Sequence, residues 1–83
     1  MLFRSGVEFV RGGARETVSA RREVVIAAGA IASPQILMLS GIGDGTALSG
    51  LGIPVVRNLP GVGRNLQDHI ATRIEYDSPS ALP

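Results

Sequence analysis

A run of five apolar residues, Val24–Ala28, ends at Gly29 and limits the folds open to this chain more than any other feature. A continuous apolar run of this kind is typical of a strand that is covered on both faces, as in a parallel sheet. A buried helical segment is the alternative, but Gly29 ends the run early, which favours the strand. The 83-residue chain offers few elements that could cover both faces. We therefore expect the chain to be a piece of something larger.

A short helix is predicted just after this run. Ser33 is a good N-cap and Pro34 is a good first helical residue, and the helix then continues to Ser40. Residues 36–39 are apolar on every side, which predicts a helix that is buried over most of its surface. Gly41 stands where helices commonly end in a left-handed residue. A strand, a turn and both ends of a helix thus follow one another closely.

The rest of the chain predicts short elements around this strand–helix unit. They are strands at 7–10 and 16–20 about a Gly12–Gly13 turn, a short helix capped by Asp44 and ending near Gly50 or Gly52, an extended segment at 53–56, a loop at 59–63 and an alternating segment at 70–76. We predict an α/β fold, α+β if the chain is taken alone, in which a short β-meander precedes an incomplete strand–helix unit. Residues 1–83 then form one partial domain, with a disordered tail at 77–83.

Composition excludes several kinds of function. The chain has no cysteine, so a disulfide framework, a thiolate zinc site and a Cys nucleophile are excluded, and its one histidine cannot build a metal site without help. It has no lysine, which a phosphate-binding P-loop requires. The net charge of +1 is scattered, which does not indicate nucleic-acid binding, and no apolar run is long enough to span a membrane. We expect a cytoplasmic protein.

Two glycine pairs and one acid–imidazole pair are better explained by structure than by chemistry. Gly41-Ile42-Gly43 and Gly61-Val62-Gly63 lack the third glycine of a dinucleotide fingerprint, so we interpret them as turn and cap residues. Asp68 and His69 are adjacent, and adjacent side chains point apart on a helix or strand. The serines have no second histidine to activate them. We assign no catalytic residue and no metal ligand.

Ala28-Gly29-Ala30 is a different case, because three small residues end the apolar strand. They let another group approach the backbone closely. At the carboxyl end of a parallel strand, that group is often a cofactor. Tight packing between helix and strand would need the same residues, so both interpretations stay open on physical grounds.

Residues 29–43 resemble the second signature of the glucose–methanol–choline (GMC) oxidoreductases. That pattern contains two small residues, then Ser-Pro, then two aliphatic residues, then Ser-Gly-aliphatic-Gly, each at fixed spacing. The matching residues are Gly29-Ala30, Ser33-Pro34, Ile36-Leu37 and Ser40-Gly41-Ile42-Gly43. Residues 6–9, 22–25, 51–55 and 59–69 also resemble the family in the same order, so the similarity covers about residues 6–76.

The resemblance implies an activity and a cofactor. Members of the family bind FAD in a Rossmann-like domain and oxidise an alcohol: a base takes the hydroxyl proton while hydride passes to the flavin. It further implies that residues 24–28 are a strand of the FAD domain and that the following helix packs behind it. The residues implied to contact FAD are Ala28, Gly29, Ala30, Ser33 and Asn65. A small alcohol is the implied substrate, and the rest of the FAD domain is the implied partner.

Three parts of the family pattern have no counterpart in these 83 residues: the Gly-x-Gly-x-x-Gly turn, the first signature and the segment with the catalytic histidine. His69 belongs to another motif and does not take that role. We expect that the chain alone neither binds FAD tightly nor oxidises an alcohol. Two alternatives stay open. One is a non-enzymatic packing or interaction module, or half of a split enzyme. The other is a free-standing nucleotide-binding domain.

Overall fold

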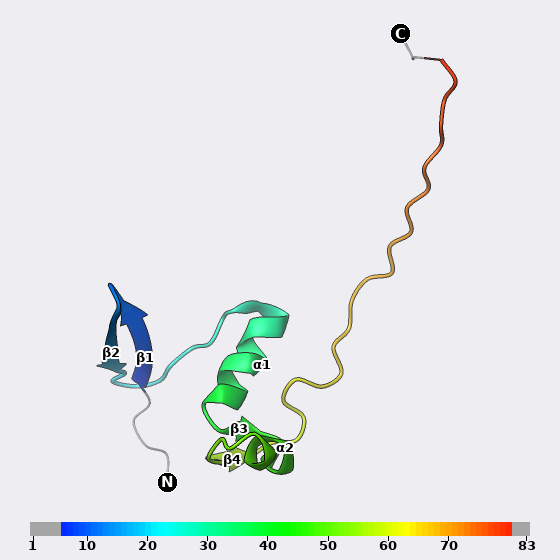
Figure 1. Cartoon of the computed structure of the whole chain (residues 1–83). Coiled ribbons are helices and arrows are strands. Elements are labelled where there is room, and N and C mark those ends of the chain that lie inside the picture. Colours follow the sequence, from blue (N-terminus) through cyan, green and yellow to red (C-terminus); the bar gives the residue numbers. More distant parts are fainter. Residues whose placement is uncertain (1–5, 81–83) are drawn as a thin grey trace.

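The computed structural model describes residues 6–80, and these residues contain both strands and helices. The elements in chain order are β1 (Gly6–Arg11), β2 (Ala14–Ser19), α1 (Gly29–Leu39), β3 (Ile42–Gly43), α2 (Gly45–Gly50) and β4 (Arg57–Asn58). This content is that of an incomplete α/β unit, as predicted. Figure 1 shows a hairpin, a compact group around α1 and α2, and a long extended segment that leads away from it. The predicted tail lies outside the described residues from position 81 on.

The first two strands form the predicted hairpin. They pair antiparallel, with Val7 opposite Val18 and Phe9 opposite Glu16, and Gly12 and Gly13 form the connection. Two glycines suit such a connection because the tight turns that match the twist of paired strands favour glycine. The second strand begins earlier than predicted, because residues 14 and 15 pair with the end of β1.

The strand predicted at 24–28 is wrong for this chain. These residues have no regular secondary structure, and Val25 is 77% exposed. A strand requires a neighbour that satisfies its backbone hydrogen-bonding groups. Neither of the two sheets in residues 6–80 includes this segment. The apolar run therefore lies outside both sheets and is unpaired.

The predicted start of α1 is also wrong. The helix begins at Gly29 rather than at Ser33 and Pro34, and Pro34 lies inside it. Gly29 has a φ of 89°, a conformation that lets the chain turn directly into the helix. Ser33 does not cap from outside: its hydroxyl accepts a hydrogen bond from the Ala28 N–H at 2.9 Å. The predicted end of the helix is confirmed, since Ser40 is the C-cap and its N–H bonds the carbonyls of residues 36 and 37.

A second group of elements packs at the end of α1. Asp44 caps α2, as predicted, by accepting from the N–H groups of Thr46 at 3.0 Å and Ala47 at 3.2 Å. β3 pairs parallel with β4 through Ile42–Arg57 and Gly43–Asn58. The extended segment predicted at 53–56 therefore precedes the paired residues. Residues 60–63 form a turn, which confirms the predicted loop.

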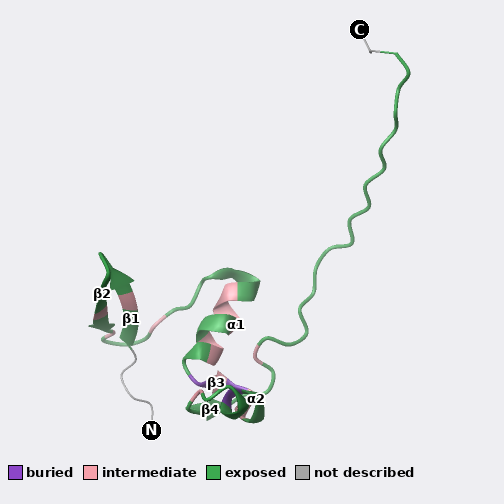
Figure 2. Cartoon of the chain, viewed as in Figure 1, coloured by how far each residue is buried: buried purple, intermediate pink, exposed green. Residues whose placement is uncertain are grey.

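The core of the described chain is small. Leu48 in α2 is the single buried apolar side chain in residues 6–80, at 2% exposure, and the buried residues in Figure 2 gather at β3 and α2. No residue of α1 is buried, so the predicted burial of this helix is not reached. An all-apolar helix can be covered only by elements that pack on every side of it. These residues do not supply them.

The alternating segment at 70–76 is extended but forms no strand. Its apolar side chains are exposed, and Ile70 is 98% exposed. An extended segment becomes a strand only when a neighbour pairs with its backbone. Within residues 6–80, no helix is both long and apolar enough to cross a lipid bilayer.

Candidate functional site

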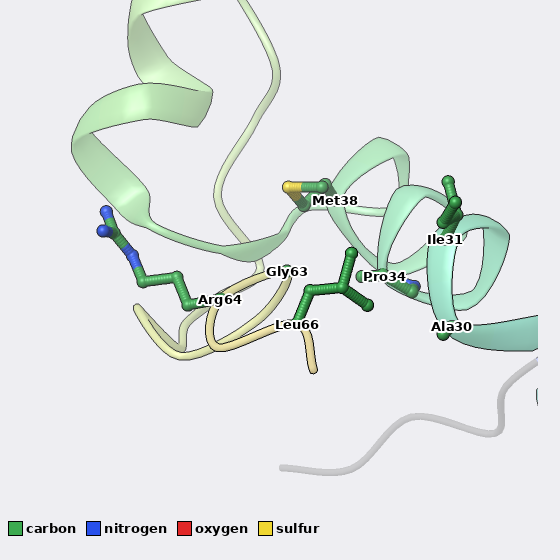
Figure 3. Close-up of a pocket in the computed structure, with 7 residues that line it drawn as sticks. All are labelled: Ala30, Ile31, Pro34, Met38, Gly63, Arg64 and Leu66. Carbon is green, nitrogen blue, oxygen red and sulfur yellow. The ribbon is translucent and has the colours of Figure 1, made fainter. Parts of the chain in front are cut away.

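A groove of about 290 Å³ lies between α1 and the loop that follows β4 (Figure 3). The residues that line it are Ala30, Ile31, Pro34, Met38, Gly63, Arg64 and Leu66. Gly63 fits closely against the helix, because a Cβ atom at this position would lie 3.4 Å from the Met38 methyl carbon and 3.8 Å from Cβ of Pro34. The groove is thus built by two segments that lie far apart in the sequence.

The small residues identified in the sequence stand where α1 begins. Ala28 is the N-cap, Gly29 opens the helix, and Ala30 lines the groove. A Cβ atom added at Gly29 would meet nothing within 4 Å, so the space beside this backbone is open. The first N–H groups of a helix have no partner within the helix and carry its positive dipole end. A polar or anionic group can therefore approach the backbone here.

Ser33 is half-buried and has a defined role in this turn. Because its hydroxyl accepts from the Ala28 N–H, it holds the turn that places Gly29. Ser33 does not line the groove. Ser33 therefore stabilises the turn at residues 28–30 from a position inside α1.

Asn65 stands beside the groove, on its loop side. Its sequence neighbours Arg64 and Leu66 both line the groove. Asn65 has a φ of 58°, the only positive φ among the non-glycine residues from 6 to 80. Asn tolerates this left-handed conformation better than most residues. The structure therefore brings the Asn65 loop and Ala30 to one groove, and Ser33 is not among the residues that line it.

The loop is tied to α2 by a residue that sequence reasoning missed. The Arg64 guanidinium donates to the Pro60 carbonyl at 3.0 Å through Nε, and its Nη2 lies 3.4 Å from Oδ2 of Asp44. Next to Asp44, the Gly45 N–H donates to Oδ1 of Asn58 at 2.9 Å. Sequence signals for capping found Asp44, but no local pattern links it to an arginine on a distant loop.

These contacts make the Asp44 carboxyl more acidic. The hydrogen bond from the Ala47 N–H is the largest cause that lowers the pKa of Asp44. The Thr46 N–H and the Arg64 guanidinium lower this pKa as well, while partial desolvation opposes them. Each of these donors favours the charged carboxylate over the neutral acid.

Acid should therefore weaken the cap of α2. Because the folded pKa of Asp44 lies below the unfolded value, its stabilising contribution is complete above the unfolded pKa and is lost as the pH falls through the folded pKa. Amide-proton NMR shifts of Thr46 and Ala47 should report this loss. Asp44→Asn keeps a capping oxygen without the charge and should abolish the titration. An unchanged titration in that variant would assign the effect to another group.

Asp68 and His69 form a local structural contact. The His69 backbone N–H donates to Oδ1 of Asp68 at 2.7 Å, so the pair is linked through backbone rather than through the imidazole. Across residues 6–80, no three His, Cys, Asp or Glu side chains gather in a way that could hold a metal ion.

Comparison with known proteins identifies the family. A sequence model described as GMC oxidoreductase matches residues 4–71, which is most of the chain. The chain belongs to the GMC oxidoreductase family. The signature at residues 29–43 lies inside the matched region. In this GMC chain, residues 29–43 contain α1, its C-cap Ser40 and β3.

Curated relatives of this GMC chain include several choline dehydrogenases. Proteins named oxygen-dependent choline dehydrogenase from Burkholderia cenocepacia and Burkholderia thailandensis are 58% identical to it, and one from Burkholderia multivorans is 56% identical. Each alignment covers 73 residues, which is 88% of this chain and 13% of the relative. The chain thus spans about an eighth of the length of these relatives. No solved structure matches it.

Proposed function

We propose that this chain forms part of the FAD-binding domain of an oxidoreductase that acts on CH–OH groups, of the choline dehydrogenase type. The family match over residues 4–71 carries the proposal, and the 58% identity to choline dehydrogenases supports the substrate class. Residues 1–83 are one partial domain in this proposal. The rest of the FAD domain is required before the cofactor is held.

The residues at the start of α1 fit a flavin nucleotide. The space beside Gly29 is open, the neighbouring side chains are only methyl groups, and unpaired helix N–H groups are suited to a phosphate or another polar part of the cofactor. The residues that would hold FAD are Ala28, Gly29, Ala30, Ser33 and Asn65. FAD, when bound, accepts the hydride from the alcohol carbon.

Each of these residues has a separate task in the proposal. Ala28 and Gly29 present backbone without a bulky side chain. Ser33 keeps that backbone in place through its hydrogen bond with the Ala28 N–H. Asn65 presents a side-chain amide, which can both donate and accept, from the loop beside the groove.

In this proposal, strands from the rest of the protein account for the unpaired segment at residues 24–28. In a Rossmann-like domain, residues 24–28 would pair with strands from the rest of the protein, and α1 would cover one face of that sheet. The exposed side chains of Val25 and Ile26, at 77% and 37%, would then be buried. The same exposure supports a second candidate, in which the chain serves as a packing module or as half of a split enzyme.

A hybrid enzyme tests the proposal. Residues 4–71 of this chain replace the matching segment in the choline dehydrogenase of Burkholderia cenocepacia. We expect the purified hybrid to contain FAD and to oxidise choline, because the exchanged segment supplies the same contacts. A folded hybrid without FAD would contradict the proposal.

A flavin titration separates the alternatives. The 83-residue chain alone should show no saturable binding of FAD, and saturable micromolar binding would support a free-standing nucleotide-binding domain instead. For the split-enzyme candidate, the chain is added to the same relative with the matching segment deleted. Recovery of bound FAD in that mixture would favour assembly from two chains.

A further inference from the structure

We propose that Arg64 is a positioning residue, which with Asp44 holds the loop at residues 63–66 against α1 and so sets the shape of the FAD contact. This inference rests on the proposed function for its link to FAD. Its structural part concerns the loop at residues 63–66, the Asp44 cap of α2 and the ion pair between Arg64 and Asp44. It assigns to Arg64 no contact with cofactor or substrate.

Arg64 first bonds to the residues just before it in the chain. Its Nε donates to the Pro60 carbonyl at 3.0 Å, and its backbone N–H donates to the Gly61 carbonyl at 3.1 Å. The Val62 N–H donates to the Leu59 carbonyl at 3.2 Å. These hydrogen bonds close the turn at residues 60–63, which leads into the loop at residues 63–66, and two of the three come from Arg64.

Arg64 then links the loop to Asp44, the N-cap of α2. Its Nη2 lies 3.4 Å from Oδ2 of Asp44, whose other oxygen accepts from the N–H groups of Thr46 and Ala47 in the first turn of α2. The neighbouring Gly45 N–H is held by Asn58 of β4. Arg64 thus contacts the junction of α2 with the β3–β4 pair, beside the buried Leu48.

The opposite side of the loop forms the wall of the groove. Gly63 packs on Met38 and Pro34, and Leu66 faces Pro34 across the groove in Figure 3. The Arg64 guanidinium points away from Leu66 and Pro34 in the same view. Arg64 also lines the groove, but its guanidinium is directed to Pro60 and Asp44, and we therefore assign it the holding of the loop.

Such a constraint would also favour the left-handed conformation of Asn65, which Asn tolerates better than most residues. A non-glycine residue in this region persists when its surroundings determine the conformation. If the ion pair is lost, the loop can relax and the Asn65 amide leaves its position beside the groove. The side chains of Arg64 and Asp44 are 65% and 34% exposed, so the effect is that of a partly solvated pair.

The hybrid enzyme measures the effect on FAD. We expect Arg64→Gln and Asp44→Asn each to weaken FAD binding about two- to fivefold, the range for an exposed ion pair. The double variant should be no weaker than the worse single variant, because both substitutions remove one interaction. Arg64→Lys keeps the charge but loses the bond to Pro60, and should fall between native and Arg64→Gln.

Arg73→Gln is the matched control. Arg73 also forms an exposed ion pair, with Glu75 at 2.9 Å, but lies on the extended segment away from the groove. It should leave FAD affinity unchanged. Equal affinities for Arg64→Gln and Arg73→Gln, or fully additive losses for Arg64→Gln and Asp44→Asn, would overturn the inference.

A second measurement does not depend on the cofactor. In the 83-residue chain, amide hydrogen exchange at Val62 and Arg64 should accelerate in Arg64→Gln and in Asp44→Asn, and stay unchanged in Arg73→Gln. Unchanged exchange in the first two would overturn the positioning role. An unsubstituted hybrid that folds without FAD would overturn the proposed function while leaving this exchange result intact.

Discussion

Gly29→Ala in the hybrid enzyme should weaken FAD binding by about tenfold or more. Two effects act together on this position. An alanine resists the φ of 89° that Gly29 adopts, and its methyl group enters the open space that we assign to the cofactor. FAD affinity, measured by titrating the flavin-free hybrid, checks this prediction.

Gly52→Ala is a closely matched control. Gly52 has a φ of 75°, and a Cβ atom added there also meets nothing within 4 Å. Both variants therefore carry a similar backbone cost, of about 1–2 kcal/mol, and should lower the melting temperature to a similar extent. Only Gly29→Ala should lose FAD. Equal FAD affinity in the two variants would remove Gly29 from the cofactor site.

The isolated 83-residue chain should self-associate. Its apolar run at residues 24–28 and the helix α1 leave large apolar side chains exposed, among them Val25, Ile31 and Leu39 at 77%, 76% and 67%. Exposed apolar surface of this extent is typical of a missing partner. Light scattering at increasing concentration should show species larger than a monomer. A concentration-independent monomer with a sharp unfolding transition would contradict the prediction.

Substitutions test whether α1 is the associating surface. Burial of one such side chain contributes about 1.5–3 kcal/mol, so Ile31→Lys or Leu39→Lys should weaken association about tenfold or more. Val10→Lys changes a similarly exposed residue, 69% exposed, on the hairpin. It should have a smaller effect. Equal effects at all three positions would indicate nonspecific aggregation.

Local signals predicted the elements that depend on local interactions. The hairpin turn, the Asp44 cap and the end of α1 at Ser40 all follow from residues within one or two turns of chain. The family signature likewise gave the correct family, because all of its constrained residues lie within the short segment 29–43.

The predictions that were wrong concern the strand at residues 24–28 and the start of α1. Residues 24–28 have strand composition, but a strand also needs a paired neighbour, and residues 6–80 provide none. The helix starts at Gly29 because its φ favours an early turn, which outweighed the Ser33-Pro34 start signal.

The candidate site was only partly predictable. Small residues before α1 indicated a close approach, and the structure adds the open space beside Gly29. The closure of the groove by the Arg64 loop depends on a contact with Asp44, twenty residues earlier. No periodicity or capping rule reports a contact at that separation.

The FAD content of the hybrid enzyme tests the central claim most directly. It is compared with that of the unmodified Burkholderia cenocepacia enzyme and of a second hybrid in which a Gly-Ser linker replaces residues 28–33. We predict that the first hybrid contains as much FAD per chain as is measured for the unmodified enzyme, and that the linker hybrid loses FAD. A folded first hybrid without FAD, or a linker hybrid that retains it fully, would contradict the claim that this chain supplies part of the FAD site.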